Sequence, residues 1–298
     1  MAIITLSSGS FCRGEEVAAK VADRLGYTEI SHEVISEASQ KYQVPADQLE
    51  QAVNFAPSFF KRFFSGKQKF VTYVAAATLA NFKKDNIVYE GFAGQFFASW
   101  TSPMTAKILA YFKNDNVAYS GFAEQSCSRT VSHLLNVKIT ADMEDRLPLL
   151  MKEKGLERRQ AMRELKKEDH RRNSWSRYYY GLDYTDDKLY GLVLHMSKMG
   201  VDEAVAAICE TVTRPGFQTS PESQQAMEAL ALAAEVKAAI DDDYPDCEVV
   251  ADRKAVEIYA RFTVHTDTMI AEKIRAKVLK MNGVSSVSVI LIPSVIFT

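Results

Sequence analysis

Two glycines five residues apart, set between an apolar run and a helical pattern, are the strongest constraint that the sequence places on its fold. Gly9 and Gly14 follow the strand-like run Ile3–Leu6 and precede the amphipathic run Glu15–Leu25. The spacing is that of the loop GxxxxGK[ST], in which backbone N–H groups and a helix N-terminus converge on phosphate oxygens. This order of strand, loop and helix favours an α/β fold.

The loop keeps the glycine spacing but lacks the lysine and the hydroxyl of the full motif. Glu15 stands where a lysine would reach the outer phosphates, and Glu16 stands where a Ser or Thr would bind Mg²⁺. Arg13 can supply a positive charge from the adjacent position. Alternatively, two glutamates in the first turn suit the helix dipole, and the segment is a glycine turn before a well-started helix. The spacing alone leaves both interpretations open.

Composition excludes several classes of protein. The chain has 298 residues, a net charge of −2, and hydrophobic and charged fractions of 47% and 25%, so no whole-protein attraction to nucleic acid or anionic membrane is expected. Its four cysteines lie far apart without metal-ligand spacing, which is typical of a reducing compartment. We find no signal-peptide pattern and no apolar run long enough to span a membrane, and we expect a cytoplasmic protein.

Short apolar runs alternate with helical patterns along residues 1–213. Strands are expected at Ile3–Leu6, Ile87–Tyr89, Val117–Tyr119, Val137–Ile139 and Leu192–His195. Helices are expected at Glu15–Leu25, Glu33–Lys41, Tyr73–Phe82, Thr105–Phe112 and Arg146–Lys152. This alternation predicts an α/β domain with a mainly parallel sheet flanked by helices.

A tandem repeat lies inside this region, at residues 79–125. The segment LANFKKDNIVYEGFAGQ at 79–95 recurs 30 positions later as LAYFKNDNVAYSGFAEQ at 109–125. Each copy is predicted as helix, strand and glycine turn, and two copies are too few for a solenoid. We therefore interpret the repeat as a local duplication that adds a helix–strand unit to the sheet.

The chain changes character after residue 213. Residues 214–225 contain Pro and Gly and predict a linker. Residues 226–298 predict a small α+β domain with the order α-β-β-α-β. Its expected elements are Ala226–Ile240, Glu248–Ala251, Val256–Val264, Met269–Met281 and Val287–Ile292.

The second half of the first domain carries a specific resemblance. A strand at Asn136–Thr140 leads into Ala141–Arg146, then a basic helical stretch, the run Arg177–Tyr184 and the strand Tyr190–His195. Together with the glycine loop, this order resembles the cytidylate kinase-like family over residues 1–213. The resemblance implies a P-loop nucleoside monophosphate kinase fold with a mobile basic lid, a transferase activity, and ATP and Mg²⁺ as cofactors.

The resemblance also implies roles for individual residues. ATP would contact Arg146 at the lid base and the loop residues Ser8, Gly9, Ser10 and Gly14. Catalytic roles would fall to Arg13 in place of the lysine and to Arg163, Arg172 and Asp169, with Asp169 orienting one of the lid arginines. The acceptor would contact Glu33, Gly121, Arg171 and Arg177.

The basic stretch has a simpler interpretation as a solvated charged helix. Glu157, Glu164 and Glu168 stand at helical spacing from the arginines and can pair with them. The matching strands on both sides of the stretch favour the lid.

Departures from the family pattern bear on catalysis. The family's Asp-Arg-Glu is replaced by Ser31-His32-Glu33, and both repeat copies have Gly-Phe-Ala where the family has Gly-Arg-Gly. A missing acceptor arginine and a missing loop lysine each remove transition-state stabilisation of several kcal/mol. Two functions stay open: ATP-dependent phosphoryl transfer to a nucleoside monophosphate or a similar small acceptor, or a catalytically impaired nucleotide-binding sensor.

The C-terminal domain resembles a BON domain. Its α-β-β-α-β order and the closing stretch Met281–Val289, with its Gly-Val-x-x-Val pattern, carry the resemblance, although Lys254 and Ala260 replace the family's hairpin glycines. The resemblance implies a small module that binds a ligand or a partner. In the sensor hypothesis this domain passes the nucleotide state to a protein or lipid-surface partner.

Overall fold

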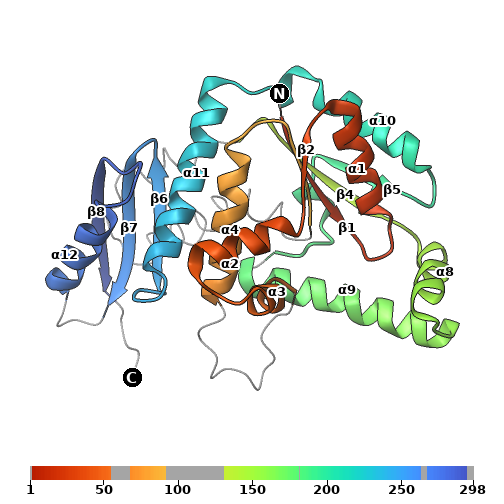
Figure 1. Cartoon of the computed structure of the whole chain (residues 1–298), viewed down its shortest axis with the longest axis horizontal. Coiled ribbons are helices and arrows are strands. Elements are labelled where there is room, and N and C mark those ends of the chain that lie inside the picture. The colour runs from red at the N-terminus through yellow and green to blue at the C-terminus, as the bar shows by residue number, and fades with distance from the viewer. Residues whose placement is uncertain (1, 55–67, 92–130, 181, 263–266, 294–298) are drawn as a thin grey trace. The chain divides into compact units, whose positions relative to one another are not determined.

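The computed structural model describes residues 2–54, 68–91, 131–180, 182–262 and 267–293 (Figure 1). These residues form two compact units. The first contains the described parts of residues 1–64, 84–98 and 132–220, and the second those of residues 65–83, 99–131 and 221–298.

A five-stranded parallel sheet forms the centre of the first unit. Its strands β1 to β5 are arranged in the order β2-β3-β1-β4-β5. They span Ile3–Ser8, Thr28–Ile30, Ile87–Glu90, Leu134–Thr140 and Leu192–His195. Because all the strands are parallel, their carboxyl ends share one edge of the sheet, where ligands of open α/β sheets bind. The loop after β1 lies at the middle of that edge.

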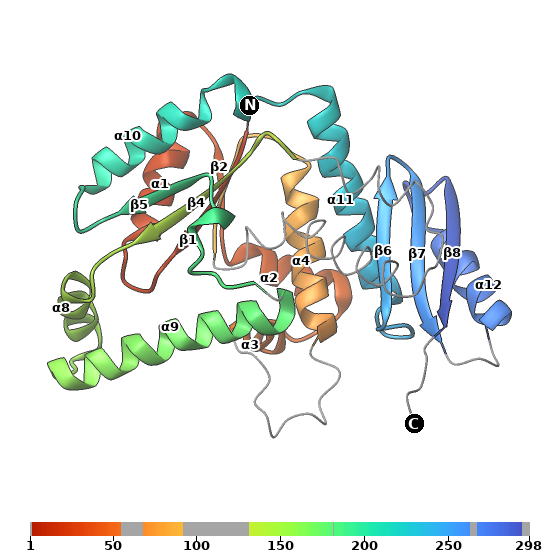
Figure 2. The same cartoon turned by 180° about the vertical axis from the view of Figure 1, so that it is seen from behind.

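Helices α1 (Gly14–Leu25) and α10 (Val201–Val212) cover one face of this sheet (Figures 1 and 2). Apolar residues of both helices are buried with those of β1, β4 and β5 in one core cluster. Helix α1 ends at Gly26, whose φ of 66° suits a left-handed C-cap. The predicted strands and helices that fall on described residues of this unit are confirmed within a few residues.

Helices α8 (Met143–Lys154) and α9 (Arg158–Tyr180) form a hairpin at the carboxyl edge of the sheet. A small core between them buries Leu147, Leu150, Ala161 and Leu165. Phe11 of the β1–α1 loop packs against this core. The basic stretch predicted from the sequence is therefore one long helix whose inner side contacts the glycine loop.

The first unit also contains elements that the sequence did not predict. Strand β2 has only three residues, and helix α3 (Ala46–Asn54) follows α2 (Glu33–Tyr42) after a short turn. Two short 3₁₀ turns lie at Asp187–Leu189 and Pro215–Phe217. The second repeat copy, with the strand Val117–Tyr119 and the helix Thr105–Phe112, lies outside the described residues.

The second unit combines two helices with a three-stranded sheet and a third helix. Along the chain its elements are α4 (Gln68–Phe82), α11 (Pro221–Ile240), β6 (Cys247–Asp252), β7 (Ala255–Phe262), α12 (Asp267–Val278) and β8 (Ser286–Pro293). The sheet order is β6-β7-β8, with β6 antiparallel and β8 parallel to β7. This confirms the predicted order α-β-β-α-β.

Two boundaries differ from the sequence prediction. Helix α11 begins at Pro221, inside the predicted linker, because proline is well accommodated at the first helical position. Helix α4 packs along α11 and groups with the second unit, although it lies in the 1–213 range. None of the described helices is long and apolar enough to cross a membrane.

Candidate functional site

The loop between β1 and α1 is a tight turn at the centre of the sheet's carboxyl edge. The Gly9 N–H donates to the Ile139 carbonyl at 3.0 Å, and the Cys12 N–H donates to the Gly9 carbonyl at 3.1 Å. Phe11 and Arg13 have φ near +60°, in the left-handed region. A Cβ on Gly14 would lie 2.2 Å from the Ser8 Cβ, so the helix can begin this close to the strand only at a glycine.

The first turn of α1 presents backbone donors. The Val17 N–H makes the first helical bond, to the Arg13 carbonyl at 3.2 Å. The N–H groups of Gly14, Glu15 and Glu16 precede it and have no hydrogen-bond acceptor within the described residues. Such donors at a helix N-terminus can bind an anion.

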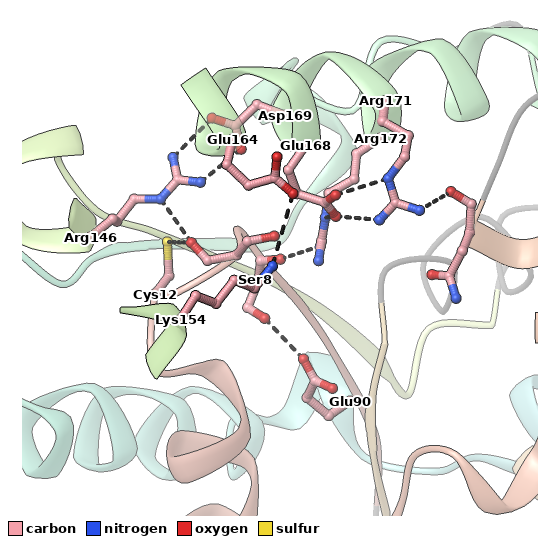
Figure 3. A network of polar contacts seen from close by, with 12 residues as sticks. Ser8, Cys12, Glu90, Arg146, Lys154, Glu164, Glu168, Asp169, Arg171 and Arg172 are labelled. Carbon is pink, nitrogen blue, oxygen red and sulfur yellow. Dashed lines mark hydrogen bonds and ion pairs between the residues drawn. The ribbon is translucent and has the colours of Figure 1, made fainter. Parts of the chain in front are cut away.

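Two lid arginines bind the backbone of this loop (Figure 3). Arg146 of α8 donates from Nε to the Ser10 carbonyl at 2.8 Å, and Arg172 of α9 donates to the Ser8 carbonyl at 2.7 Å. The guanidinium groups predicted to contact phosphate therefore lie beside the loop, but their hydrogen bonds go to backbone carbonyls.

Asp169 compensates the charge of Arg146. Its two carboxylate oxygens accept from the Arg146 guanidinium at 2.9 and 2.8 Å, a bidentate pair. The Arg146 side chain is only 8% exposed. The sequence predicted that Asp169 orients one of the candidate phosphate clamps Arg163, Arg171, Arg172 and Arg177. This prediction was wrong, because the described partner of Asp169 is Arg146 at the lid base.

Glu168 pairs with the two arginines that follow it on α9. Its carboxylate accepts from Arg172 Nε at 3.1 Å and from Arg171 at Nε and at the guanidinium end. Arg171 also donates to the Asn54 carbonyl. Desolvation acts to raise the pKa of Glu168, but the hydrogen bonds from Arg171 outweigh it and hold the pKa below its ordinary value. Glu168 thus behaves as the charged-helix interpretation expected.

Glu90 brings a carboxylate to the same place from the end of β3. Its Oε1 accepts from the Ser8 hydroxyl at 2.9 Å. Desolvation by the surrounding protein raises the pKa of Glu90, and the nearby Glu15 carboxylate adds to the rise. We name the group Ser8, Glu90, Arg146, Glu168, Asp169, Arg171 and Arg172 the loop–lid cluster.

The loop–lid cluster contains three arginines and three carboxylates, of which Glu168 and Asp169 bind the arginines and Glu90 binds Ser8. Burial also raises the pKa of the Cys12 thiol behind the loop and raises the pKa of Tyr184 to about 12. Both side chains are therefore neutral near pH 7.

Other predicted site residues lie elsewhere. Arg13 is half-exposed and pairs with Glu16 at 2.7 Å. Arg163 is exposed about 13 Å along α9 from Arg172, and Arg177 pairs with Asp183 at the far end of that helix. Glu33 accepts from the Ser31 N–H at 2.8 Å, which lowers its pKa. Gly121 lies outside the described residues.

Sequence reasoning missed two contributors: Glu90 and Phe11. The signal for Glu90 was present, because it directly follows the buried strand Ile87–Tyr89, whose carboxyl end meets that of β1 at one edge. No sequence signal marked Phe11.

The described residues contain no group of three or more His, Cys, Asp or Glu side chains placed to hold a metal ion. Mg²⁺ in nucleotide sites is usually held by one or two carboxylates together with phosphate oxygens, so Glu90 is the side chain of the cluster that suits it.

Comparisons with known proteins find one family model and several similar solved structures. A model of the Cytidylate kinase-like family matches residues 3–198. No curated protein matches the chain. Similar solved structures include an uncharacterized protein from Eubacterium ventriosum, with 16% identity over 71% of this chain and 97% of that chain and a TM-score of 0.46.

Two kinds of named protein are also among these structures. Shikimate kinase from Bacteroides thetaiotaomicron has 10% identity over 72% of this chain and 99% of its own, with a TM-score of 0.40. The YorR protein of Bacillus subtilis, in complex with phosphorylated GDP, has 15% identity over 73% of this chain and 99% of its own, with a TM-score of 0.35. Likenesses of this size carry no argument about substrate.

Proposed function

We propose that this chain, which belongs to the cytidylate kinase-like family, binds a nucleotide at the loop–lid cluster and acts as a sensor with impaired phosphoryl transfer. The observation that carries the proposal is the pair of contacts from Arg146 and Arg172 to the Ser10 and Ser8 carbonyls. These contacts lie beside the open N–H groups of the first turn of α1.

A phosphate group suits this arrangement because it can replace protein acceptors with a more strongly charged one. Arg172 and Arg146 can turn from neutral carbonyls to phosphate oxygens, where both partners of the hydrogen bond carry a charge and an arginine can bind two oxygens at once. The amides of Gly14, Glu15 and Glu16 add donors. Nucleotide binding would thereby exchange the contacts that hold the α8–α9 hairpin on the loop.

Rapid phosphoryl transfer needs a surplus of positioned positive charge, which the cluster lacks. Glu15 stands at the lysine position, Arg13 pairs with Glu16, and Glu90 adds a carboxylate beside Ser8. The loss of one stabilising donor commonly lowers the rate about 10²- to 10³-fold. We therefore infer slow or absent turnover.

The second candidate function is ATP-dependent phosphoryl transfer to a nucleoside monophosphate or a similar small acceptor. The gathering of Arg146, Arg171 and Arg172 at the carboxyl edge favours it, since these cations could stabilise charge on a moving phosphoryl group. When bound, Mg²⁺ would neutralise phosphate charge, and Glu90 could hold it. The protein's own contribution would be to orient the phosphates and exclude water under α9.

The C-terminal unit is the proposed output of the sensor. Its α-β-β-α-β order supports the BON-like interpretation, in which the unit binds a protein or a lipid surface. Cytoplasmic location is part of the same proposal.

Calorimetry with ATP and with CMP, each with and without Mg²⁺, tests nucleotide binding. We expect binding by the wild type, at least about 10-fold weaker binding by Arg172→Ala, and unchanged binding by the matched variant Arg13→Ala, whose exposed side chain pairs with Glu16. Absence of binding in every combination would refute the proposal.

A coupled kinase assay with CMP, dCMP, UMP and AMP separates the two functions. Turnover with any acceptor, abolished in Arg172→Ala, supports the phosphotransferase. Binding without turnover supports the sensor.

A further inference from the structure

The edge strand β8 of the three-stranded sheet is less covered than the strand beside it. In β7, Ile258 and Tyr259 are 0% and 1% exposed, whereas their register partners in β8, Val289 and Ile290, are only half-buried. Ile258 and Val289 point to one face of the sheet, and Tyr259 and Ile290 point to the other. The difference in burial between β7 and β8 is therefore present on both faces. It comes from the open side of β8, which pairs only with β7 among the described strands.

Strand β8 also lacks the features that usually protect an edge. Eight residues, Ser286–Pro293, contain no charged side chain, and the one proline is at the end. The opposite edge strand, β6, carries Glu248 and Asp252. Natural sheets normally block edges with charges, prolines or bulges, and an uncharged edge of this length is a template for another strand.

Helix α12 places complementary groups above this edge. Ile274 and Val278 are buried toward the sheet, and Lys277 pairs with Asp243 after α11, so that side of α12 faces α11. At about 100° per residue, Arg275 and Leu279 lie on the opposite side, toward the open edge. Leu279 is a large apolar side chain with 46% exposure.

Charge on this side of α12 is self-complementary. Glu272 and Arg275 form a loose pair of 3.6 Å within one helix, and both side chains are substantially exposed. If two copies of α12 lie antiparallel, Glu272 of each copy faces Arg275 of the other. Two ion pairs between the copies then replace the two long ion pairs within the separate helices.

We propose that β8 pairs antiparallel with β8 of a second copy of this chain, so that the two three-stranded sheets join into one. A two-fold axis perpendicular to the sheet relates the copies, and each surface patch meets itself, as in isologous dimers. The backbone N–H and C=O groups on the open side of β8 find partners. Both α12 helices lie on one face, and Val287, Val289 and Leu291 extend a continuous apolar layer beneath them. This inference is independent of the nucleotide site.

Light scattering coupled to size-exclusion chromatography of the full chain tests the dimer. We expect a wild-type mass of twice the 33.4 kDa of one chain. Ser288→Lys, at an exposed position of β8, adds a positive charge to the pairing strand of each copy and should return the mass to that of one chain. The matched variant Gln225→Lys adds the same charge at an exposed position of α11 and should leave the dimer intact.

A charge-reversal cycle adds a test of the helix contact. Arg275→Glu should weaken the dimer at least 10-fold, and combining it with Glu272→Arg should restore it, with unchanged melting temperature of dilute samples as the folding control. A wild type with the mass of one chain at every concentration overturns the proposal. A dimer that persists in Ser288→Lys, or that is lost equally in Gln225→Lys, also overturns it and points to another surface or to general charge.

Discussion

The two sheets differ in whether side chains bind the backbone at their edges. At the carboxyl edge of the five-stranded sheet, Arg172 donates a hydrogen bond to the Ser8 carbonyl and Arg146 donates one to the Ser10 carbonyl. At the β8 edge of the three-stranded sheet, the described residues leave the backbone open and the apolar side chains half-buried. A ligand at the first edge must therefore compete with internal partners, whereas a partner at the second adds to an incomplete core.

The largest change in stability is expected in the second unit, where a buried strand and an edge strand can be compared directly. Ile258→Ala removes a fully buried side chain and should lower the free energy of unfolding by about 4 kcal/mol. Its register partner gives the control: Val289→Ala should cost only about 1 kcal/mol, because that side chain is only partly buried. Chemical denaturation measures both, and equal losses would contradict an open edge.

Breaking the charge pair at the lid base should be the next largest effect. Arg146→Ala leaves the Asp169 carboxylate and the Ser10 carbonyl without their donor and should cost about 3 kcal/mol in the free energy of unfolding. The double variant Arg146→Ala/Asp169→Ala should recover part of this loss.

An exposed ion pair of the same hairpin provides the control. Arg158→Ala breaks the contact with Glu144 and should change the free energy of unfolding by no more than about 0.5 kcal/mol. If Arg146→Ala were as mild as Arg158→Ala, the lid would not depend on its contacts with the loop.

Restoring the loop chemistry should strengthen nucleotide binding. Glu15→Lys with Glu16→Thr removes two carboxylates from the first turn of α1, of which Glu15 acts on Glu90, and supplies the cation and hydroxyl of the full motif. We expect ATP to bind about 10-fold more tightly, or about 1.4 kcal/mol, by calorimetry. Weaker binding by this variant would mean that the phosphates do not lie at the first turn of α1.

The smallest effect concerns pH. Glu90 has a raised pKa in the folded protein, so the folded state holds its proton more tightly than the unfolded state. Stability should therefore fall as pH rises from the unfolded value near 4.5 through the folded value. Glu90→Gln should raise the melting temperature at pH 7 and make no difference near pH 4; an equal change at both pH values would assign the effect to packing.

The sequence predicted most of the first sheet because its strands are apolar runs between helical patterns. It did not predict β2, because three residues carry too little periodic signal. In the second unit, the position of α4 depends on packing against α11, which lies about 150 residues away along the chain and which no local pattern records.

The sequence predicted many of the residues of the candidate site, but it did not predict most of the contacts between them. Ser8, Arg146, Asp169 and Arg172 do gather at one edge of the sheet (Figure 3), and the Ser10 carbonyl accepts from Arg146. That the arginines bind loop carbonyls and neighbouring acids could not be predicted, because partner choice depends on distances between separate elements. The ion pair between Arg13 and Glu16 is a local contact, because the two residues lie about one helical turn apart.

Phosphorus NMR of the full chain mixed with ATP, Mg²⁺ and CMP tests the central claim most directly, because one spectrum reports both binding and turnover. Binding at the loop–lid cluster without transfer predicts that the ATP phosphate resonances shift or broaden, while ADP and CDP signals stay at the level of a protein-free sample. Growth of ADP and CDP signals would contradict the sensor and establish a kinase. ATP resonances that do not change would contradict nucleotide binding itself.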